Sequence, residues 1–390
     1  MTLTVLRWLI LLLACAPFVY YLLCIYGALH FFLEKPRYES ASGDFAPPAS
    51  ILKPVRGLDR EAYENFSSFC QLDYPEYEIL FAVSDAEDPA IPVIQKLIRD
   101  FPQRSIRLLI GAENLGASSK VCKLVRLVRE ARHPLLVISD SDVRVSPDYL
   151  RAVAAPLRDP QVGAVTMFFR GMADRHLGSE IESVSNSSEF CAGVLVARLL
   201  EGVKFTLGAT MATTRERLAE IGGFEALVDY HFDDFELGNR IAARGYRIEL
   251  IPYTVWMVYP AQTLPDYLQH ELRWEIGLRH SRPGGHAGLL FTHGMAWSLA
   301  AAAVAPSTAV GVAYLATYLV LRLLMAWVVG VWGLKDPVLR RRLWLVPLRD
   351  ALAFLIWLAS FGSNRIRWRG LEFTIRKGRL VPVAPRSGRG

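Results

Sequence analysis

The sequence contains few cysteines, and none of them lies in a pattern that carries chemistry. The five cysteines of this 390-residue chain are Cys15, Cys24, Cys70, Cys122 and Cys191. No two of them have the spacing of a zinc site or a redox pair, and nothing indicates a disulfide framework. This usage is typical of a reducing, cytosolic environment, and we assign the thiols no role.

The sequence also lacks charge over long stretches, although 52% of its residues are hydrophobic. Between Val5 and Leu33 the only charged residue is Arg7. This run is long enough to cross a bilayer, and it lacks the short apolar core and small-residue cleavage site of a signal peptide. We therefore predict a transmembrane anchor over residues 1–34.

A second group of apolar segments is predicted over residues 287–362. The block 289–333 is long enough for two spans joined by a tight turn, and the block 343–361 contains Arg349 and Asp350. The uninterrupted part of the latter is too short to span a bilayer, so three full spans and a re-entrant last segment are expected.

Positive charge gathers beside these apolar blocks and in the predicted tail, residues 363–390. The net charge is +6, and clusters of Lys and Arg follow the first span, separate the later blocks and follow the last one. The positive-inside rule places them in the cytoplasm. Anionic lipid headgroups are a sufficient partner for them, so nucleic-acid binding is not expected.

Between the apolar ends, residues 45–285 show strands alternating with helices, and no repeat or low-complexity tract interrupts them. This pattern predicts one α/β domain with a mostly parallel sheet. The predicted strands cover 49–54, 77–83, 106–110, 135–139, 162–167 and 205–213, and the predicted helices cover 60–70, 91–101, 118–131, 178–199 and 215–221.

Acidic residues follow two of the predicted strands. Asp140 and Asp142 come directly after the apolar run 135–139, and Asp85 follows the strand 77–83. Ligands bind at the carboxyl ends of parallel strands, so these carboxylates are expected at one rim of the sheet. An Asp-x-Asp pair of hard oxygens suits Mg²⁺ or Mn²⁺, which in turn binds a diphosphate.

Two further clusters lie nearer the second membrane block. Asp233 and Asp234 open an apolar-periodic helix, where one acid can serve as a cap and either can act as a general base. The segment from His270 to Trp274 places Arg273 beside an aromatic residue. A plain interfacial amphipathic helix is the alternative explanation of this last segment.

The order of these motifs resembles a membrane-bound, family 2-like glycosyltransferase, and more closely the ceramide glucosyltransferase family. Further matching segments are residues 52–59, 71–75, 84–90 and 111–120. The resemblance extends over nearly the whole chain. No single short motif is decisive, but the ordered set is specific.

This resemblance implies a GT-A fold, a UDP-sugar donor, a divalent metal and a lipid acceptor. It implies that Asp140 and Asp142 bind the metal and the sugar diphosphate, and that Asp234 is the catalytic base, with Asp233 as the other candidate. The implied donor-binding residues are Lys53, Pro54, Asp85, Lys120, Asp140, His270, Arg273 and Trp274. The chain departs from the family's Gln/Arg-x-x-Arg-Trp motif at His270.

The resemblance leaves the substrates open. Alanine- and arginine-rich composition, the short N-terminus and the segment 281–288 resemble the bacterial, hopanoid-associated branch. That branch implies transfer of N-acetylglucosamine to bacteriohopanetetrol by an enzyme of the bacterial inner membrane whose catalytic domain faces the cytoplasm. The alternative is a UDP-glucose:ceramide glucosyltransferase.

Other classes of protein share parts of this pattern. A processive polysaccharide synthase has the same Asp and Arg-Trp order but usually has an intact Gln-x-x-Arg-Trp motif and more spans. An inactive membrane scaffold or a lipid carrier is suggested by Arg322, Arg349 and Asp350, because charges within spans often mark a pathway. Retention of all three acidic motifs favours an enzyme.

Overall fold

The computed structural model describes residues 2–34, 45–111, 113–368 and 371–383. Within it the chain forms two compact units. One unit contains the sheet and comprises residues 35–172, 201–260 and 378–390. The other contains the apolar helices and comprises residues 1–34, 173–200 and 261–377. The predicted catalytic domain, 45–285, thus contributes residues to both units.

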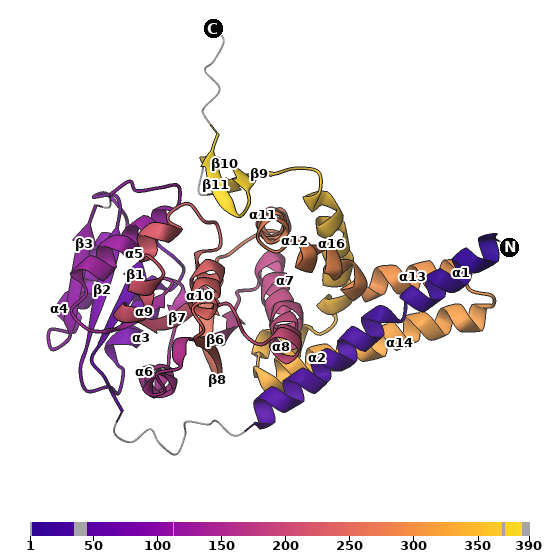
Figure 1. Cartoon of the computed structure of the whole chain (residues 1–390), viewed down its shortest axis with the longest axis horizontal. Coiled ribbons are helices and arrows are strands. Elements are labelled where there is room, and N and C mark those ends of the chain that lie inside the picture. Colours follow the sequence, from indigo (N-terminus) through magenta and orange to yellow (C-terminus); the bar gives the residue numbers. More distant parts are fainter. Residues whose placement is uncertain (1, 35–44, 112, 369–370, 384–390) are drawn as a thin grey trace, which may run out of the picture. The chain divides into compact units, whose positions relative to one another are not determined.

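The sheet unit is built on eight strands in the order β3-β2-β1-β4-β7-β6-β8-β5 (Figure 1). Strands β1, β2, β3 and β4 are parallel, whereas β7 runs antiparallel to both of its neighbours and β5 runs antiparallel to β8. The strands are β1 (Ala49–Pro54), β2 (Tyr77–Val83), β3 (Ser105–Ile110), β4 (Leu135–Ser139), β5 (Val143–Arg144), β6 (Val162–Met172), β7 (Thr210–Thr214) and β8 (Arg247–Val258).

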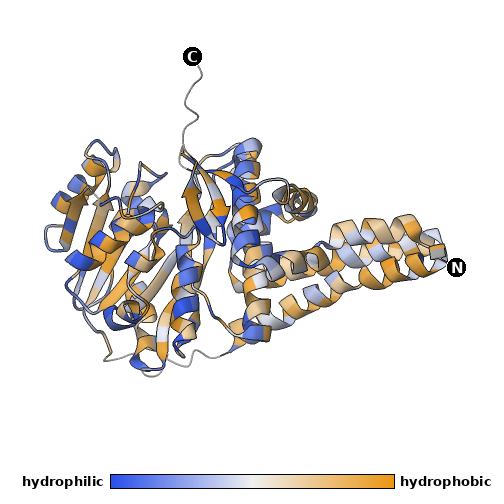
Figure 2. Cartoon of the chain, turned by 45° about the horizontal axis from the view of Figure 1, so that its top comes forward, coloured by the Kyte–Doolittle hydropathy of each residue, from blue (hydrophilic) through white to orange (hydrophobic). Residues whose placement is uncertain are grey.

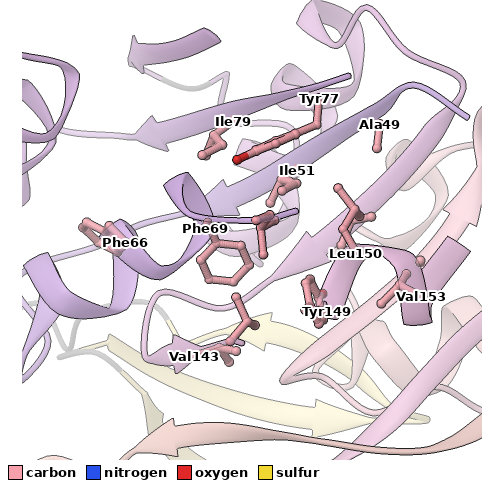
Figure 3. Close-up of a cluster of buried hydrophobic side chains, with 14 of the residues drawn as sticks. Ala49, Ile51, Phe66, Phe69, Tyr77, Ile79, Val143, Tyr149, Leu150 and Val153 are labelled. Atoms are coloured by element: carbon pink, nitrogen blue, oxygen red, sulfur yellow. The ribbon is translucent and has the colours of Figure 1, made fainter. Parts of the chain in front are cut away.

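The central strands are apolar because helices cover both faces of the sheet. Every residue of β1, β2 and β4 is buried, as is usual for parallel strands. One core cluster packs Phe66, Phe69 and Tyr149 against Ile51 and neighbouring strand residues (Figure 3). The helices are α3 (Ala62–Cys70), α4 (Ala90–Asp100), α5 (Ser119–Glu130), α6 (Tyr149–Ala154), α9 (Arg215–Glu220) and α10 (Asp233–Ala243).

One predicted strand has different bounds, and one strand was not predicted. The strand predicted over 205–213 begins only at Thr210, because the preceding residues form a turn in which the Leu207 amide donates to the Thr166 hydroxyl at 2.9 Å. The long strand β8 was not predicted. Its sequence mixes exposed and buried positions without a regular alternation, so it carries no clear period-two signal.

The second unit is mainly helical. It contains α1 (Thr2–Leu13), α2 (Ala16–Leu33), α7 (Leu177–Ser185), α8 (Cys191–Glu201), α11 (Leu264–Ser281), α12 (Pro283–Gly288), α13 (Gly294–Val304), α14 (Thr308–Ala326), α15 (Pro337–Arg342) and α16 (Leu345–Ser360). π-Helical segments join α7 to α8 and continue α14. A three-stranded sheet of order β11-β10-β9 follows α16. In this sheet β9 (Arg365–Trp368) and β10 (Leu371–Arg376) are antiparallel, and β11 is Arg379–Pro382.

Apolar residues dominate α1, α2, α13 and α14 (Figure 2). Two helical segments of the described chain, Leu3–Leu33 and Thr308–Gly333, are long and apolar enough to cross a membrane. A third candidate exists only if Pro283–Thr292 and Gly294–Val304, which meet at an angle of 50°, form one broken span. Because α13 alone has only 11 residues, the expected span at the start of block 289–333 requires this broken pair, and the count of three spans stays a prediction.

Candidate functional site

The carboxyl ends of β1 and β4 meet because these strands are parallel neighbours. Lys53, near the end of β1, donates to the carbonyl oxygen of Asp140 at 2.9 Å and to the hydroxyl of Ser139 at 3.3 Å. Burial lowers the pKa of Lys53 to about 7, although the carboxylates of Asp140, Asp142 and Asp59 act in the opposite direction. The ammonium group holds the end of β4, and Pro54 completes β1 as a buried residue.

Lys120 connects two acidic motifs that are far apart in the sequence. Its Nζ lies 2.9 Å from Asp140 Oδ1 and 3.5 Å from Asp233 Oδ2. Burial lowers the pKa of Lys120, but the carboxylates of Asp140, Asp233 and Asp234 outweigh it and raise the pKa above its ordinary value. Lys120 is therefore charged at neutral pH, and it offsets part of the negative charge that the two motifs bring together.

Asp234 lies in the first turn of α10, where the helix dipole favours a negative charge. Its Oδ1 accepts the Phe235 amide at 2.8 Å, and its carbonyl oxygen accepts the Thr206 hydroxyl at 2.7 Å. A side chain at Gly208 would place Cβ only 2.8 Å from Asp234 Oδ2. The glycine therefore leaves room for this oxygen.

The pKa values of both acids on α10 are raised. Burial, reinforced by the adjacent Asp233, raises the pKa of Asp234 to about 7 against the influence of Lys120. Burial also raises the pKa of Asp233, which binds Lys120. A carboxylate whose pKa lies near neutrality is suited to accept a proton during catalysis.

Among the acids at the carboxyl ends of the strands, Asp142 has the fewest contacts that offset its negative charge. Its Oδ1 is buried and has no hydrogen-bond partner among the described residues. Burial, followed by the charges of Asp140 and Asp59, raises the pKa of Asp142 to about 8. Asp59 is brought close by Ser141, whose hydroxyl donates to Asp59 Oδ2. Repulsion among three carboxylates is relieved by a nearby cation.

These residues fit a divalent cation that is held jointly by the protein and a ligand. Within the described part of the chain, no group of three or more His, Cys, Asp and Glu side chains is arranged to hold a metal ion unaided. Mg²⁺ bound with a nucleotide usually takes only one or two protein carboxylates and fills its remaining positions with phosphate and water. The unpartnered oxygen of Asp142 beside Asp140 matches that requirement.

The two acids after β2 have different surroundings. Asp85 is exposed, and its Oδ1 accepts the Glu87 amide at 3.0 Å. Asp88 is buried, and its carboxylate accepts the Gly57 amide at 3.1 and 2.9 Å and the Ala90 amide at 2.9 Å. Asp88 thus ties the loop after β1 to the start of α4. The donor-binding role of Asp85 stays a prediction.

The residues predicted from the Arg-Trp motif lie on α11, in the unit of apolar helices. His270 Nδ1 is 3.1 Å from Glu182 Oε1, and the indole of Trp274 packs edge-on against Phe190. The structure brings the acids at 140, 142, 233 and 234 together within the sheet unit. The roles of His270, Arg273 and Trp274 toward a donor remain predictions from the sequence.

Three acids of the sheet unit, Asp59, Asp88 and Asp229, were not among the predicted site residues. Asp229 Oδ1 accepts the Ala117 amide at 3.0 Å and so holds the loop that leads to Lys120. Asp59 and Asp88 fall within the segments 52–59 and 84–90 that carry the family resemblance, which was the available signal. Asp59 bonds Ser141, and Asp88 bonds Gly57 as well as the neighbouring Ala90, so the long-range contacts of both acids could not be read from spacing.

Comparison with known proteins gives a family and a set of relatives. The family model described as "Glycosyl transferase family 21" matches residues 8–381. Ceramide glucosyltransferase 3 of Caenorhabditis elegans is 26% identical over 229 residues, covering 58% of this chain and 50% of that protein. The ceramide glucosyltransferase of Gibberella zeae is 31% identical over 138 residues, covering 33% and 26%. The matches thus span half or less of these relatives.

A solved structure shares the fold. The mannosyltransferase PcManGT from Pyrobaculum calidifontis, in complex with GDP-Man and Mn²⁺, superposes with a TM-score of 0.54. The match covers 91% of this chain and 99% of that one at 19% sequence identity. The predicted GT-A-like fold with a mostly parallel sheet is thereby confirmed.

Proposed function

The chain belongs to glycosyl transferase family 21, and we propose that it transfers a sugar from a UDP-sugar to a hydroxyl group of a membrane lipid. The observation that carries this proposal is the bridge from Lys120 to both Asp140 and Asp233. It joins the predicted diphosphate and metal site to the acidic pair of α10, which includes the predicted base Asp234, within one unit. The candidate spans support a lipid acceptor, because helices of this length and apolarity are suited to a membrane.

The proposed reaction is an inverting displacement. The acceptor hydroxyl attacks the anomeric carbon, its proton passes to Asp234, and the bond between that carbon and the UDP oxygen breaks. Asp234 is favoured over Asp233 because Asp233 is bound to Lys120, whereas Gly208 leaves space beside Asp234 Oδ2. Asp140 and Asp142 would hold the divalent cation, Mn²⁺ or Mg²⁺, which when bound supplies positive charge to the diphosphate.

Two substrate pairs are proposed. UDP-N-acetylglucosamine with bacteriohopanetetrol is favoured by the segment 281–288 and by the composition of the chain. UDP-glucose with ceramide is favoured by the names of the curated relatives. The proposed location is the bacterial inner membrane, with the sheet unit facing the cytoplasm because basic residues flank the apolar segments.

The substrates can be identified with the full-length protein in detergent. Each UDP-sugar is offered with each lipid in the presence of Mn²⁺ or Mg²⁺, and the products are read by mass spectrometry. A hexosamine on the hopanoid identifies the first pair, and a hexose on ceramide identifies the second. Absence of product and of UDP release with every pair contradicts the proposed function and favours an inactive scaffold or carrier.

The assignment of the base is tested by Asp234→Asn. This nearly isosteric change removes the proton acceptor, so we expect kcat to fall about 10²–10⁴-fold. Binding of the UDP-sugar, measured by calorimetry, should stay within about twofold because the predicted donor ligands are unchanged. Asp100→Asn is the matched control, since Asp100 is exposed and bonds only the Tyr63 hydroxyl in the described contacts. Wild-type turnover in Asp234→Asn would contradict the assignment.

A further inference from the structure

The last described strand, β11 (Arg379–Pro382), lies against the segment that precedes the acids of α10. The Leu380 amide donates to the Asp229 carbonyl at 2.7 Å, and the His231 amide donates to the Gly378 carbonyl at 3.1 Å. These bonds make an antiparallel bridge between Tyr230 and Arg379. The bridge ends three residues before Asp234.

Side chains reinforce this bridge. Arg379 Nε donates to the Tyr230 hydroxyl at 3.3 Å, and its guanidinium lies 5.2 Å from the centroid of the Tyr230 ring. Arg240, from α10 itself, lies 5.0 Å from the same centroid. Leu380 is only 3% exposed. The contact therefore combines backbone pairing, a hydroxyl bond, cation–π contacts and apolar burial.

The segment that receives β11 also controls the position of Lys120. The Ser118 amide donates to the Val228 carbonyl at 2.7 Å, and the Ala117 amide donates to the Asp229 carboxylate. Ser118 then caps α5, whose second residue is Lys120. Residues 228–231 therefore connect the loop before Lys120 with the turn that carries Asp233 and Asp234.

β11 is not one of the strands of the eight-stranded sheet. The eight strands of the sheet all come from residues 49–258, and β11 contributes no residue to the two large apolar clusters of the sheet. β11 therefore adds little to the core of the sheet unit. Its hydrogen bonds lie beside Asp233 and Asp234, where they can fix the position of these acids. A displacement of about 1 Å in such a group can lower a catalytic rate about 10²-fold.

We propose that β11 is a positioning element of the active site, which pairs with residues 229–231 and thereby holds Asp233, Asp234 and Lys120 in register. The catalytic part of this inference rests on the proposed sugar transfer. The ordering of residues 229–236 by β11 is independent of the reaction. β11 touches no reacting group in this proposal, and it acts only through the backbone that carries the acids.

The test compares two substitutions at one position in the full-length protein. Leu380→Pro removes the amide that donates to Asp229, and proline keeps the preceding Arg379 in the extended conformation that a strand requires. Leu380→Ala shortens the same buried side chain and keeps the amide, so it is the matched control. Arg379→Ala is a milder second variant, which removes the contacts with Tyr230 and leaves the backbone bonds.

We expect Leu380→Pro to lower kcat about tenfold or more and to raise KM for the UDP-sugar by a smaller factor, because the acids move directly with residues 229–231 whereas Lys120 moves only through the bonds of the Ser118 and Ala117 amides. We also expect faster amide hydrogen exchange in residues 229–236, which reports local loosening directly. Arg379→Ala should show about a threefold loss in kcat. Leu380→Ala should fall between the wild type and Leu380→Pro in both measurements, because it loses apolar burial and keeps the amide bond to Asp229.

The two readouts separate the two proposals. If the wild-type protein transfers sugar and Leu380→Pro has the same kcat, the role of β11 is overturned and the proposed function stays intact. If the wild-type protein transfers no sugar, the proposed function fails and exchange decides: unchanged exchange in Leu380→Pro overturns the role of β11, and faster exchange in 229–236 supports it.

Discussion

Lys120 is the single cation that contacts both Asp140 and Asp233 in the described structure. It reaches them from the start of α5, where the Ser118 hydroxyl accepts the Val121 amide and begins the helix. The carboxylate of Asp233 is buried and that of Asp140 is half-buried, so their charges depend on the ammonium group between them. The charge of Lys120 thus stabilises the folded arrangement of these acids.

Lys120→Met should therefore destabilise the protein. Removing the ammonium leaves the buried carboxylate of Asp233 facing the half-buried Asp140 without the cation between them, which we expect to lower the free energy of unfolding by about 3 kcal/mol. The change is read as a fall in Tm by thermal unfolding in detergent. Mn²⁺ should raise Tm more in the variant than in the wild type, because the cation replaces part of the lost positive charge.

The matched control for this change is Lys96→Met on the exposed side of α4. Lys96 lies over the ring of Tyr63, at 4.3 Å from its centroid, and contacts no acid of the site in the described structure. Its loss should alter stability by no more than about 0.5 kcal/mol. Equal Tm values for Lys120→Met and the wild type would mean that the bridge does not stabilise the fold.

The raised pKa of Asp234 predicts a pH dependence. The carboxylate is the form that accepts a proton, and burial raises its pKa to about 7. The activity kcat/KM should therefore fall about tenfold per pH unit below pH 7 and level off above it. A profile measured from pH 5 to 9 checks this. An activity that stays constant down to pH 5 would exclude Asp234 as a base with this pKa.

At the scale of elements, the charges predicted within the apolar segments form a paired core. Arg322 of α14 donates to both carboxylate oxygens of Asp350 on α16 at 2.8 to 3.2 Å, and to the Ser188 carbonyl at 3.1 Å. Ser188 lies in the π-helical segment between α7 and α8. Arg349 pairs with Glu189 of the same segment. These charges join helices, and this pairing weakens the case for a lipid or ion pathway.

Asp350→Ala tests this pairing. The substitution leaves the buried guanidinium of Arg322 with Glu189, 3.7 Å away, as its remaining described acidic contact, so we expect a loss of about 3 kcal/mol in stability. The double substitution Arg322→Met with Asp350→Leu should recover most of that loss, because it removes both charges. Tm in detergent distinguishes the two variants. A double variant less stable than Asp350→Ala would contradict a purely electrostatic cause.

At the scale of the whole molecule, Leu3–Leu33 and Thr308–Gly333 are the candidate membrane spans of the described chain. α16 has 16 residues and is not among the candidate spans of the described chain. The basic residues before it, on α15, and those after it, on β9 and β10, should therefore lie on the same side.

Cysteine labelling checks this topology. Arg340→Cys and Arg376→Cys lie before and after α16, and both should react with a membrane-impermeant maleimide from the cytoplasmic side. Both arginines are exposed, and four of the five native cysteines are buried, so background labelling is confined mainly to Cys15. Labelling of the two positions from opposite sides would show that α16 crosses the membrane.

The sequence by itself determined the features that depend on local patterning. The buried strands β1, β2 and β4, the helices between them, and the acids at strand and helix ends follow from periodicity and from the chemistry of Asp, and the ordered motifs predicted the family. The positions of β7 and β8 could not be predicted, because a turn and an irregular burial pattern hide the period of a strand.

Tertiary structure alone decided which charged residues meet. Lys120 joins Asp140 to Asp233, Ser141 draws Asp59 toward Asp142, and Arg322 pairs with Asp350 across helices. Each of these contacts joins residues that are remote in sequence or lie in different elements. Burial then shifts the pKa values of the site, and burial is a property of the packed fold that no spacing in the sequence records.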